Sequence, residues 1–251
     1  MSLLTESNAA DIVKSGMTVG VGGFGLDRKP LALLDLLIQR GVRDLDLHVY
    51  AGGLDVERLT AANAVRRIAS SHVGLDQFGL SPSYRVARET ARIEVEEWSE
   101  WSMLVAWRAA AEHVPFTSVS IDPATELFRV NPSFSRMRCP FSGVESAVVK
   151  APRIEVALLQ AEAVHPDGWV INAGDEYADA LLARAATVTI VCAERLIDDA
   201  ELKRRWLEVQ IIDTVIDHVV LSPGGASPGS CQPLYGVNSA AINSLLGTVR
   251  P

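Results

Sequence analysis

Cysteine is scarce in this chain. Cys139, Cys192 and Cys231 are the three cysteines in 251 residues, and they lie far apart in the sequence. A scattered set of this kind gives neither a disulfide framework nor the close spacing that binds a metal ion. We therefore expect reduced, buried thiols in a cytoplasmic protein, and no metal site.

Excess positive charge and long apolar runs are also missing. Lys and Arg number 23 against 31 Asp and Glu, and the resulting net charge of -8 argues against general nucleic-acid binding while leaving a local basic patch open. No apolar run reaches the length of a membrane span, and the N-terminus lacks the basic-then-apolar pattern of a signal peptide. We expect neither a nucleic acid nor a membrane as a partner.

Alternating apolar runs and amphipathic stretches occupy most of the chain, which is 48% hydrophobic. The pattern predicts strands at 17–21, 45–50, 65–70, 93–96, 154–164, 187–191 and 215–221. It predicts helices at 30–39, 54–62, 83–90, 99–111, 175–186 and 198–206. Strands separated by helices indicate an α/β fold with a mostly parallel open sheet flanked by helices, whose ligands bind at the carboxyl ends of the strands.

Residues 114–152 interrupt this regular pattern. Prolines stand at 115, 123, 132, 140 and 152, and phenylalanines at 116, 128, 134 and 141. Four aromatic residues are unusual in a flexible tether. We predict an irregular excursion with one or two strands that covers one end of the sheet, within a single domain spanning 1–251.

A glycine-rich segment at 20–30 is the most distinctive local feature. Gly20, Gly22 and Gly25 match the dinucleotide-binding spacing between a strand and a helix. The second strand, however, lacks the acidic residue that such sites use for the ribose, and no Gly-Lys-Ser/Thr follows to make a P-loop. Two interpretations remain, a tight turn and a loop in which backbone approaches a ligand.

Several segments, in the correct order, resemble the α subunit of family I coenzyme A-transferases. They are 15–25 (SGMTVGVGGFG) followed by Pro30, 96–99 (EEWS), 114–116 (VPF), 165–170 (HPDGWV), 221–226 (LSPGGA) and 233–236 (PLYG). Arg28-Lys29-Pro30 is closer to the glutaconate-type α subunits than to the 3-oxoacid type. The chain is also similar to the α subunit of the steroid-ring hydrolase, a relative that opens a ring in a coenzyme A (CoA) thioester.

The resemblance implies that CoA moves between an acyl-CoA and a carboxylic acid through a glutamate nucleophile. In the family this glutamate belongs to the β half, in a turn after a strand. The corresponding turn here, 50–53, contains no acid. The resemblance therefore implies a β subunit that carries the nucleophile, in a heterodimer or heterotetramer. The CoA thioester is then a substrate, and no permanently bound cofactor is expected.

Glu100 is the best local candidate for direct chemistry. It follows the strand at 93–96, and Trp98 and Trp101 are expected to desolvate it, as a general base needs. In the hydrolase-like relatives, a glutamate in this segment looks like the catalytic base that activates water. The resemblance places this base at Glu100 in the present chain, with Glu97 as the alternative position. The alternative is that Glu100 is a first-turn residue facing the helix dipole.

Arg28 and Lys29 have two interpretations, pairing with a substrate carboxylate or CoA phosphate, and solvated surface charges. His72 follows the third strand at its carboxyl edge.

A nicotinamide-dependent oxidoreductase is disfavoured, and a non-catalytic member of the fold remains an alternative function. Besides catalytic Glu100, the expected substrate- and CoA-binding residues are Gly22, Gly23, Phe24, Gly25, Arg28, Lys29, Tyr50, Gly52, Gly53 and His72.

Overall fold

The computed structural model, which describes residues 1–122 and 124–248, contains a 10-stranded sheet in which most neighbouring strands are parallel. The strand order is β1-β13-β11-β9-β2-β3-β4-β5, and two short antiparallel strands extend it, β10 beside β9 and β12 beside β10. These strands are β1 (Ser2–Leu4), β2 (Thr18–Phe24), β3 (Leu45–Gly52), β4 (Val65–Val73), β5 (Glu94–Glu97), β9 (Ile154–Val164), β10 (Val170–Ile171), β11 (Ala186–Leu196), β12 (Val209–Ile211) and β13 (His218–Leu221). The predicted α/β class with a mostly parallel sheet is confirmed.

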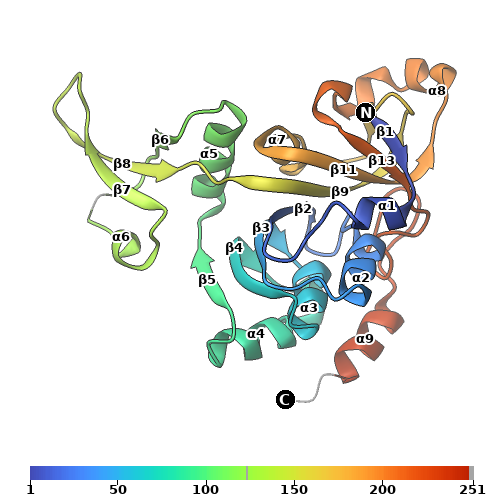
Figure 1. The fold of residues 1–251 in the computed structure, drawn as a ribbon, viewed down its shortest axis with the longest axis horizontal. Helices are drawn as coiled ribbons and strands as arrows, with labels where there is room; N and C mark the ends of the chain where they lie inside the picture. Colours follow the sequence, from blue (N-terminus) through green and yellow to red (C-terminus); the bar gives the residue numbers. More distant parts are fainter. Residues whose placement is uncertain (123, 249–251) are drawn as a thin grey trace.

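Helices cover both faces of this sheet (Figure 1). They are α1 (Glu6–Ala10), α2 (Leu31–Gln39), α3 (Leu54–Ala61), α4 (Pro82–Glu89), α5 (Glu100–Ala111), α6 (Leu127–Val130), α7 (Asp179–Ala185), α8 (Asp199–Arg204) and α9 (Ser239–Thr248). One hydrophobic core lies between the sheet and α1 to α4, and a second lies between the sheet and α5 and α7.

Strand β3 shows how the sequence divides its side chains between the two faces. Leu45, Leu47 and Val49 alternate along it and enter the core beneath α2 and α3. Because successive side chains of a strand point to opposite faces, Asp46, His48 and Tyr50 lie on the face that α5 and α7 cover. Within this polar row, Tyr50 contacts Glu100 and His48 lines a cavity.

The predicted element boundaries fit best in the first half of the chain, and β9 has the bounds expected for it. Four later elements differ. The helix expected at 175–186 begins only at Asp179, and the helix expected at 198–206 ends at Arg204. The strand expected at 187–191 extends to Leu196, and β13 begins at His218 after a 3₁₀ turn at Asp213–Val215. Tyr177, at φ 52°, has a left-handed backbone that cannot continue a helix.

The predicted structure of residues 114–152 is wrong. This segment contains three strands, β6 (Phe116–Ser118), β7 (Phe134–Arg138) and β8 (Glu145–Lys150), paired as a separate antiparallel sheet. This sheet projects away from the main body instead of covering one end of it (Figure 1). Phe134 and Val149 anchor it against the core under α5, whereas Phe141 in the turn is 97% exposed. Pro123 lies outside the described residues.

No helix within the described parts of the chain has both the length and the apolar character needed to cross a membrane.

Candidate active site

The carboxyl ends of β2, β3 and β4 bring most of the predicted site residues together. Phe24 lies opposite Ala51, and Ala51 lies opposite His72. The Gly25 amide donates to the Ala51 carbonyl at 3.2 Å, and the Gly74 amide donates to the Gly52 carbonyl at 3.0 Å. The glycine loop and the 50–53 turn therefore form one continuous edge, as parallel strand ends do in this fold class.

The glycines of this edge allow two backbones to touch. A Cβ at Gly53 would lie 1.9 Å from the Gly25 carbonyl oxygen. Gly23 has φ 73°, and a Cβ there would lie 2.3 Å from the Arg28 carbonyl oxygen. A side chain at either position would displace the neighbouring backbone, so close packing alone requires both glycines.

The loop amides already have partners inside the chain. The Gly23 amide donates to Asp179 Oδ1 at 2.7 Å, and the Phe24 amide donates to the Asp27 carbonyl at 3.0 Å. The Gly53 amide donates to Asp55 Oδ1 at 2.6 Å. Because these donors are engaged, the loop offers a shaped wall and the Phe24 ring, and these three amides are not free donors for an oxyanion.

Arg28 lies under the loop and is only 1% exposed. Its Nη2 donates to the Asp175 carbonyl at 2.6 Å, and its guanidinium lies 3.6 Å from the carboxylates of Asp27 and Asp179 and 4.5 Å from the centre of the Tyr177 ring. Burial raises the pKa of Asp179, and the nearby Arg28 opposes that rise. The Arg28 charge is therefore balanced by groups of its own chain.

Lys29 is buried completely beneath the same edge. Its Nζ lies 3.1 Å from Asp55 Oδ2 and donates to the carbonyls of Ala51 at 2.8 Å and Gly23 at 3.2 Å. One ammonium group thus joins the glycine loop, the 50–53 turn and α3. Its role in the structure is to hold these three segments together.

Tyr50 and Glu100 form the polar contact at the open side of this edge. The Tyr50 hydroxyl donates to Glu100 Oε2 at 3.3 Å, and the Phe24 ring lies edge-on to the Tyr50 ring at 6.0 Å. Burial and the Glu100 carboxylate both raise the pKa of Tyr50. Ser99 caps α5 through the Ser102 amide, which fixes the backbone that carries Glu100.

The two tryptophans do not enclose Glu100 as expected. Trp101 is 59% exposed, and Trp98 is buried against Phe134 with 5.0 Å between the ring centres. Glu100 itself is exposed to solvent. Glu97, the other carboxylate considered, is also exposed and pairs with Arg88.

His72 lies apart from the Tyr50–Glu100 contact. It lines a neighbouring cavity of about 280 Å³ together with Ser70, Tyr84, Arg88 and Glu97. Neither Tyr50 nor Glu100 lines that cavity. The structure therefore brings together the glycine loop, the 50–53 turn and Glu100, whereas His72 lines a separate, neighbouring cavity.

Tyr177 and Asp179 belong to this edge and were not predicted. The Tyr177 ring stacks on Phe24 at 5.4 Å, its hydroxyl donates to Asp27 Oδ2 at 3.1 Å, and Asp179 accepts from the loop. The sequence signal was the acidic stretch at 175–179 directly after Gly174, which fits a loop as readily as a helix.

Comparison with known proteins agrees with this architecture. Residues 4–222 match the Coenzyme A transferase family, and the chain belongs to that family. It is 30% identical over 243 residues to the A subunit of glutaconate CoA-transferase from Acidaminococcus fermentans, across 90% of this chain and 76% of that one. The crystal structure of that transferase has a TM-score of 0.88 over 96% of this chain and 82% of its own chain, at 28% identity.

Two further relatives have different activities in their names. The chain is 30% identical over 237 residues to the cholesterol ring-cleaving hydrolase IpdA subunit of Mycobacterium tuberculosis, across 89% of this chain and 80% of that one. The crystal structure of a variant of the decarboxylase AibA/AibB has a TM-score of 0.89 over 98% of this chain and 92% of its own chain, at 27% identity. The predicted resemblance to the glutaconate-type transferase and to the ring-cleaving hydrolase is confirmed, and the word "subunit" in both names implies a partner chain.

Proposed function

We propose that this chain is the α subunit of an enzyme that moves CoA between an acyl-CoA and a carboxylic acid, with a β subunit that supplies the nucleophile. The observation that carries this proposal is the carboxyl edge at which the glycine loop, Tyr50 and Glu100 meet. The turn at 50–53 has no acidic residue, although it stands where a strand-end nucleophile would be placed. The similarity to the glutaconate CoA-transferase chain supports the same division of labour.

The chemistry assigns different tasks to the two chains. A carboxylate on the β subunit first attacks the thioester carbonyl, the CoA thiolate leaves, and an acyl anhydride forms. The thiolate then attacks the enzyme side of the anhydride, which releases the carboxylic acid and leaves CoA on the β subunit. The reverse sequence with the second acid completes the transfer. The CoA ester is a substrate throughout, and the free cysteines suit a reducing compartment such as the cytoplasm.

In this scheme the present chain binds and positions the acyl group. Phe24 and Tyr50 supply adjacent aromatic surface for its body, beside the turn at 50–53. Arg28 and Lys29 act indirectly, by fixing the loops from beneath. Positioning of this kind accounts for a large share of rate enhancement when two reacting groups must meet in one geometry.

The proposal is tested by measuring exchange of labelled CoA between an acyl-CoA and a free acid. We expect exchange from the complex of the two chains and none from either chain alone. A complex that forms but catalyses no reaction of any CoA ester would instead identify a non-catalytic member of the fold.

The Tyr50–Glu100 contact favours a second candidate, hydrolysis of a CoA ester with Glu100 as general base. The carboxylate is exposed, held at a helix start and bonded to a phenol, so water can reach it. The similarity to the IpdA hydrolase chain supports this candidate.

Replacing Glu100 separates the two reactions. For hydrolysis, Glu100→Gln is expected to lower kcat by about 10²–10⁴-fold, with loss of ¹⁸O incorporation from labelled water. Glu97→Gln is the matched control, because Glu97 is an exposed carboxylate of the same segment that pairs with Arg88. Exchange without ¹⁸O incorporation, and equal activity of the two variants, would exclude hydrolysis by Glu100.

A further inference from the structure

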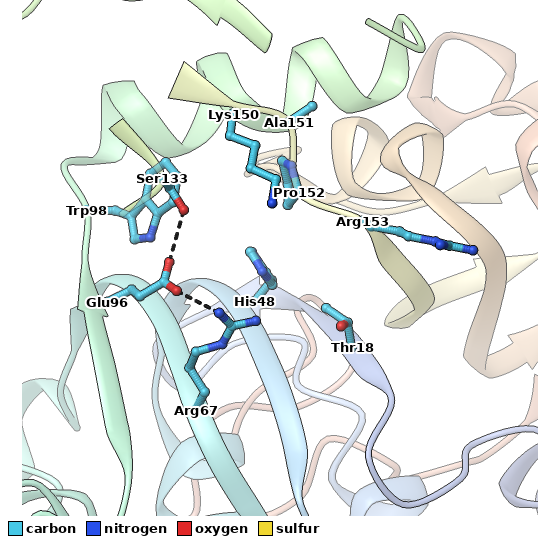
Figure 2. Close-up of a pocket in the computed structure, with 10 residues that line it drawn as sticks. All are labelled: Thr18, His48, Arg67, Glu96, Trp98, Ser133, Lys150, Ala151, Pro152 and Arg153. Atoms are coloured by element: carbon cyan, nitrogen blue, oxygen red, sulfur yellow. Dashed lines mark hydrogen bonds and ion pairs between the residues drawn. The ribbon is translucent and has the colours of Figure 1, made fainter. Parts of the chain in front are cut away.

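A second cavity lies away from the carboxyl edge, on the face of the sheet that carries His48. It has a volume of about 180 Å³ and lies between strands β2 to β5 and the segment at 150–153 that joins β8 to β9 (Figure 2). His48 precedes Tyr50 by two residues on the same face of β3, so the cavity is set back by one strand repeat from the Tyr50–Glu100 contact.

The floor of the cavity is a charge cluster that balances itself. Arg67 lies 2.8 Å from the carboxylates of both Asp46 and Glu96, and Arg66 adds a second contact of 2.8 Å to Asp46. Ser133 donates to the other oxygen of Glu96 at 3.3 Å. Two guanidinium groups thus offset two carboxylates, and this floor carries no excess charge.

Lys150 adds a positive charge that the floor does not offset. Its ammonium group has no hydrogen-bond or ion-pair partner among the residues that the structure describes, and it points into the space above His48 (Figure 2). Arg153 lines the cavity through its stem, and its guanidinium group points away from the other lining residues (Figure 2). Lys150 therefore makes this cavity attractive to an anion.

His48 is a buried polar group without a partner. It is only 7% exposed, and within the described residues its imidazole makes no hydrogen bond. Burial and the nearby Arg67 lower its pKa to about 4, so the ring is neutral near pH 7 and has one N–H to donate. An unpaired polar group in such a place costs free energy that a ligand oxygen would recover.

The shape of the cavity limits the ligand further. The Trp98 ring and Pro152 give it apolar walls. A cavity of about 150 Å³ holds a benzene molecule, so 180 Å³ suits a ring-sized body with a carboxylate group. Pockets for large ligands begin at about 300 Å³, which excludes CoA itself from this space.

We propose that this cavity is a binding site for a small carboxylate with a compact apolar body. The carboxylate oxygens accept from Lys150 Nζ and the His48 ring N–H, and the body packs between Trp98 and Pro152. The site is separate from the proposed acyl-CoA site, so its existence does not depend on that function.

Benzoate, benzamide and inorganic phosphate are the probes that test this site. The full chain, labelled at its histidine rings, is titrated with each probe while the His48 ring resonance is followed by NMR and assigned from His48→Gln. We expect a saturable shift with benzoate, and at least about tenfold weaker binding for both benzamide and phosphate. Benzamide keeps the body without the charge, and phosphate keeps the charge without the body.

Lys150→Gln is expected to weaken benzoate binding at least about tenfold. Lys150 is exposed, so this change should leave the fold intact, and Lys203→Gln on exposed α8 is the matched control that should bind benzoate like the unchanged protein. Three results would each overturn the proposal: no saturable His48 shift with benzoate, equal binding of either comparison probe, or undiminished binding by Lys150→Gln.

Discussion

Lys29 shows why the type of a residue does not reveal its task. A basic pair after a glycine loop is typical of an anion site, yet the Lys29 ammonium is fully buried and bonded to three groups of its own chain. Asp55, which balances its charge, stands 26 positions later in the chain. No local pattern links the two residues, because the contact arises from the crossing of two loops.

Removing the Lys29 charge is expected to destabilise the fold strongly. Lys29→Ala leaves the fully buried Asp55 carboxylate without a counter-ion, which costs about 3–5 kcal/mol of unfolding free energy. Urea denaturation measures the loss. Lys203→Ala, at an exposed position, should change stability by less than about 0.5 kcal/mol. Similar losses in the two variants would show that the buried ion pair is not the cause.

His48 is expected to make stability depend on pH. Its folded pKa of about 4 lies below the ordinary 6.5, so between these values the unfolded chain binds a proton that the folded chain does not. Above pH 6.5 the free energy of unfolding does not depend on the protonation of His48. As the pH falls from 6.5 toward 4, the free energy of unfolding decreases because of His48, by about 3 kcal/mol in all.

The comparison of the original chain with His48→Gln isolates this contribution. Urea denaturation at several pH values should show that stability falls more steeply below pH 6.5 for the original chain than for the variant. Parallel curves would contradict the assignment to His48.

Elements are predictable where the local pattern repeats without interruption. Strands and helices between residues 17 and 111 alternate regularly, and their observed bounds lie within three residues of the predicted ones. The placement of Tyr50 and Glu100 at one edge followed from the same alternation. The segment at 175–178 was wrongly predicted as helix because its polar and small residues fit a helix start, whereas the backbone turns left-handed at Tyr177.

The projecting sheet of β6, β7 and β8 was harder to predict. Its strands are short, and few of their side chains enter the core, so the pattern of buried and exposed residues is weak. Prolines in its connections indicated irregular structure, but the direction in which it leaves the main body depends on packing against α5.

The contact between the 50–53 turn and the glycine loop gives a prediction about how these elements pack. In Gly53→Ala the new methyl group meets the Gly25 carbonyl at 1.9 Å, and the two loops must separate. We expect a loss of about 1–3 kcal/mol or more in unfolding free energy, together with lower activity of the complex. Gly247→Ala on α9 meets no atom within 4 Å and should raise stability by about 0.5–1 kcal/mol. Equal effects of the two substitutions would show that the loops tolerate a side chain.

At the scale of the whole molecule, we propose that this chain forms one side of a site shared with a partner chain. Its fold matches that of glutaconate CoA-transferase. At its carboxyl edge Phe24 and Tyr50 are half-buried and Glu100 is exposed, and the 50–53 turn contains no acid. The sequence indicated both the fold and the missing acid. It could not indicate that the loop amides and both loop cations are engaged internally, because those contacts join segments up to 156 positions apart.

The position of a covalent CoA adduct tests the central proposal most directly. The complex with the β subunit is incubated with an acyl-CoA, quenched in acid, and the mass of each chain is measured. Our account predicts that a glutamate of the β subunit carries a CoA thioester while this chain carries none. An adduct on this chain, or turnover by this chain alone, would contradict the proposal that the nucleophile belongs to another polypeptide.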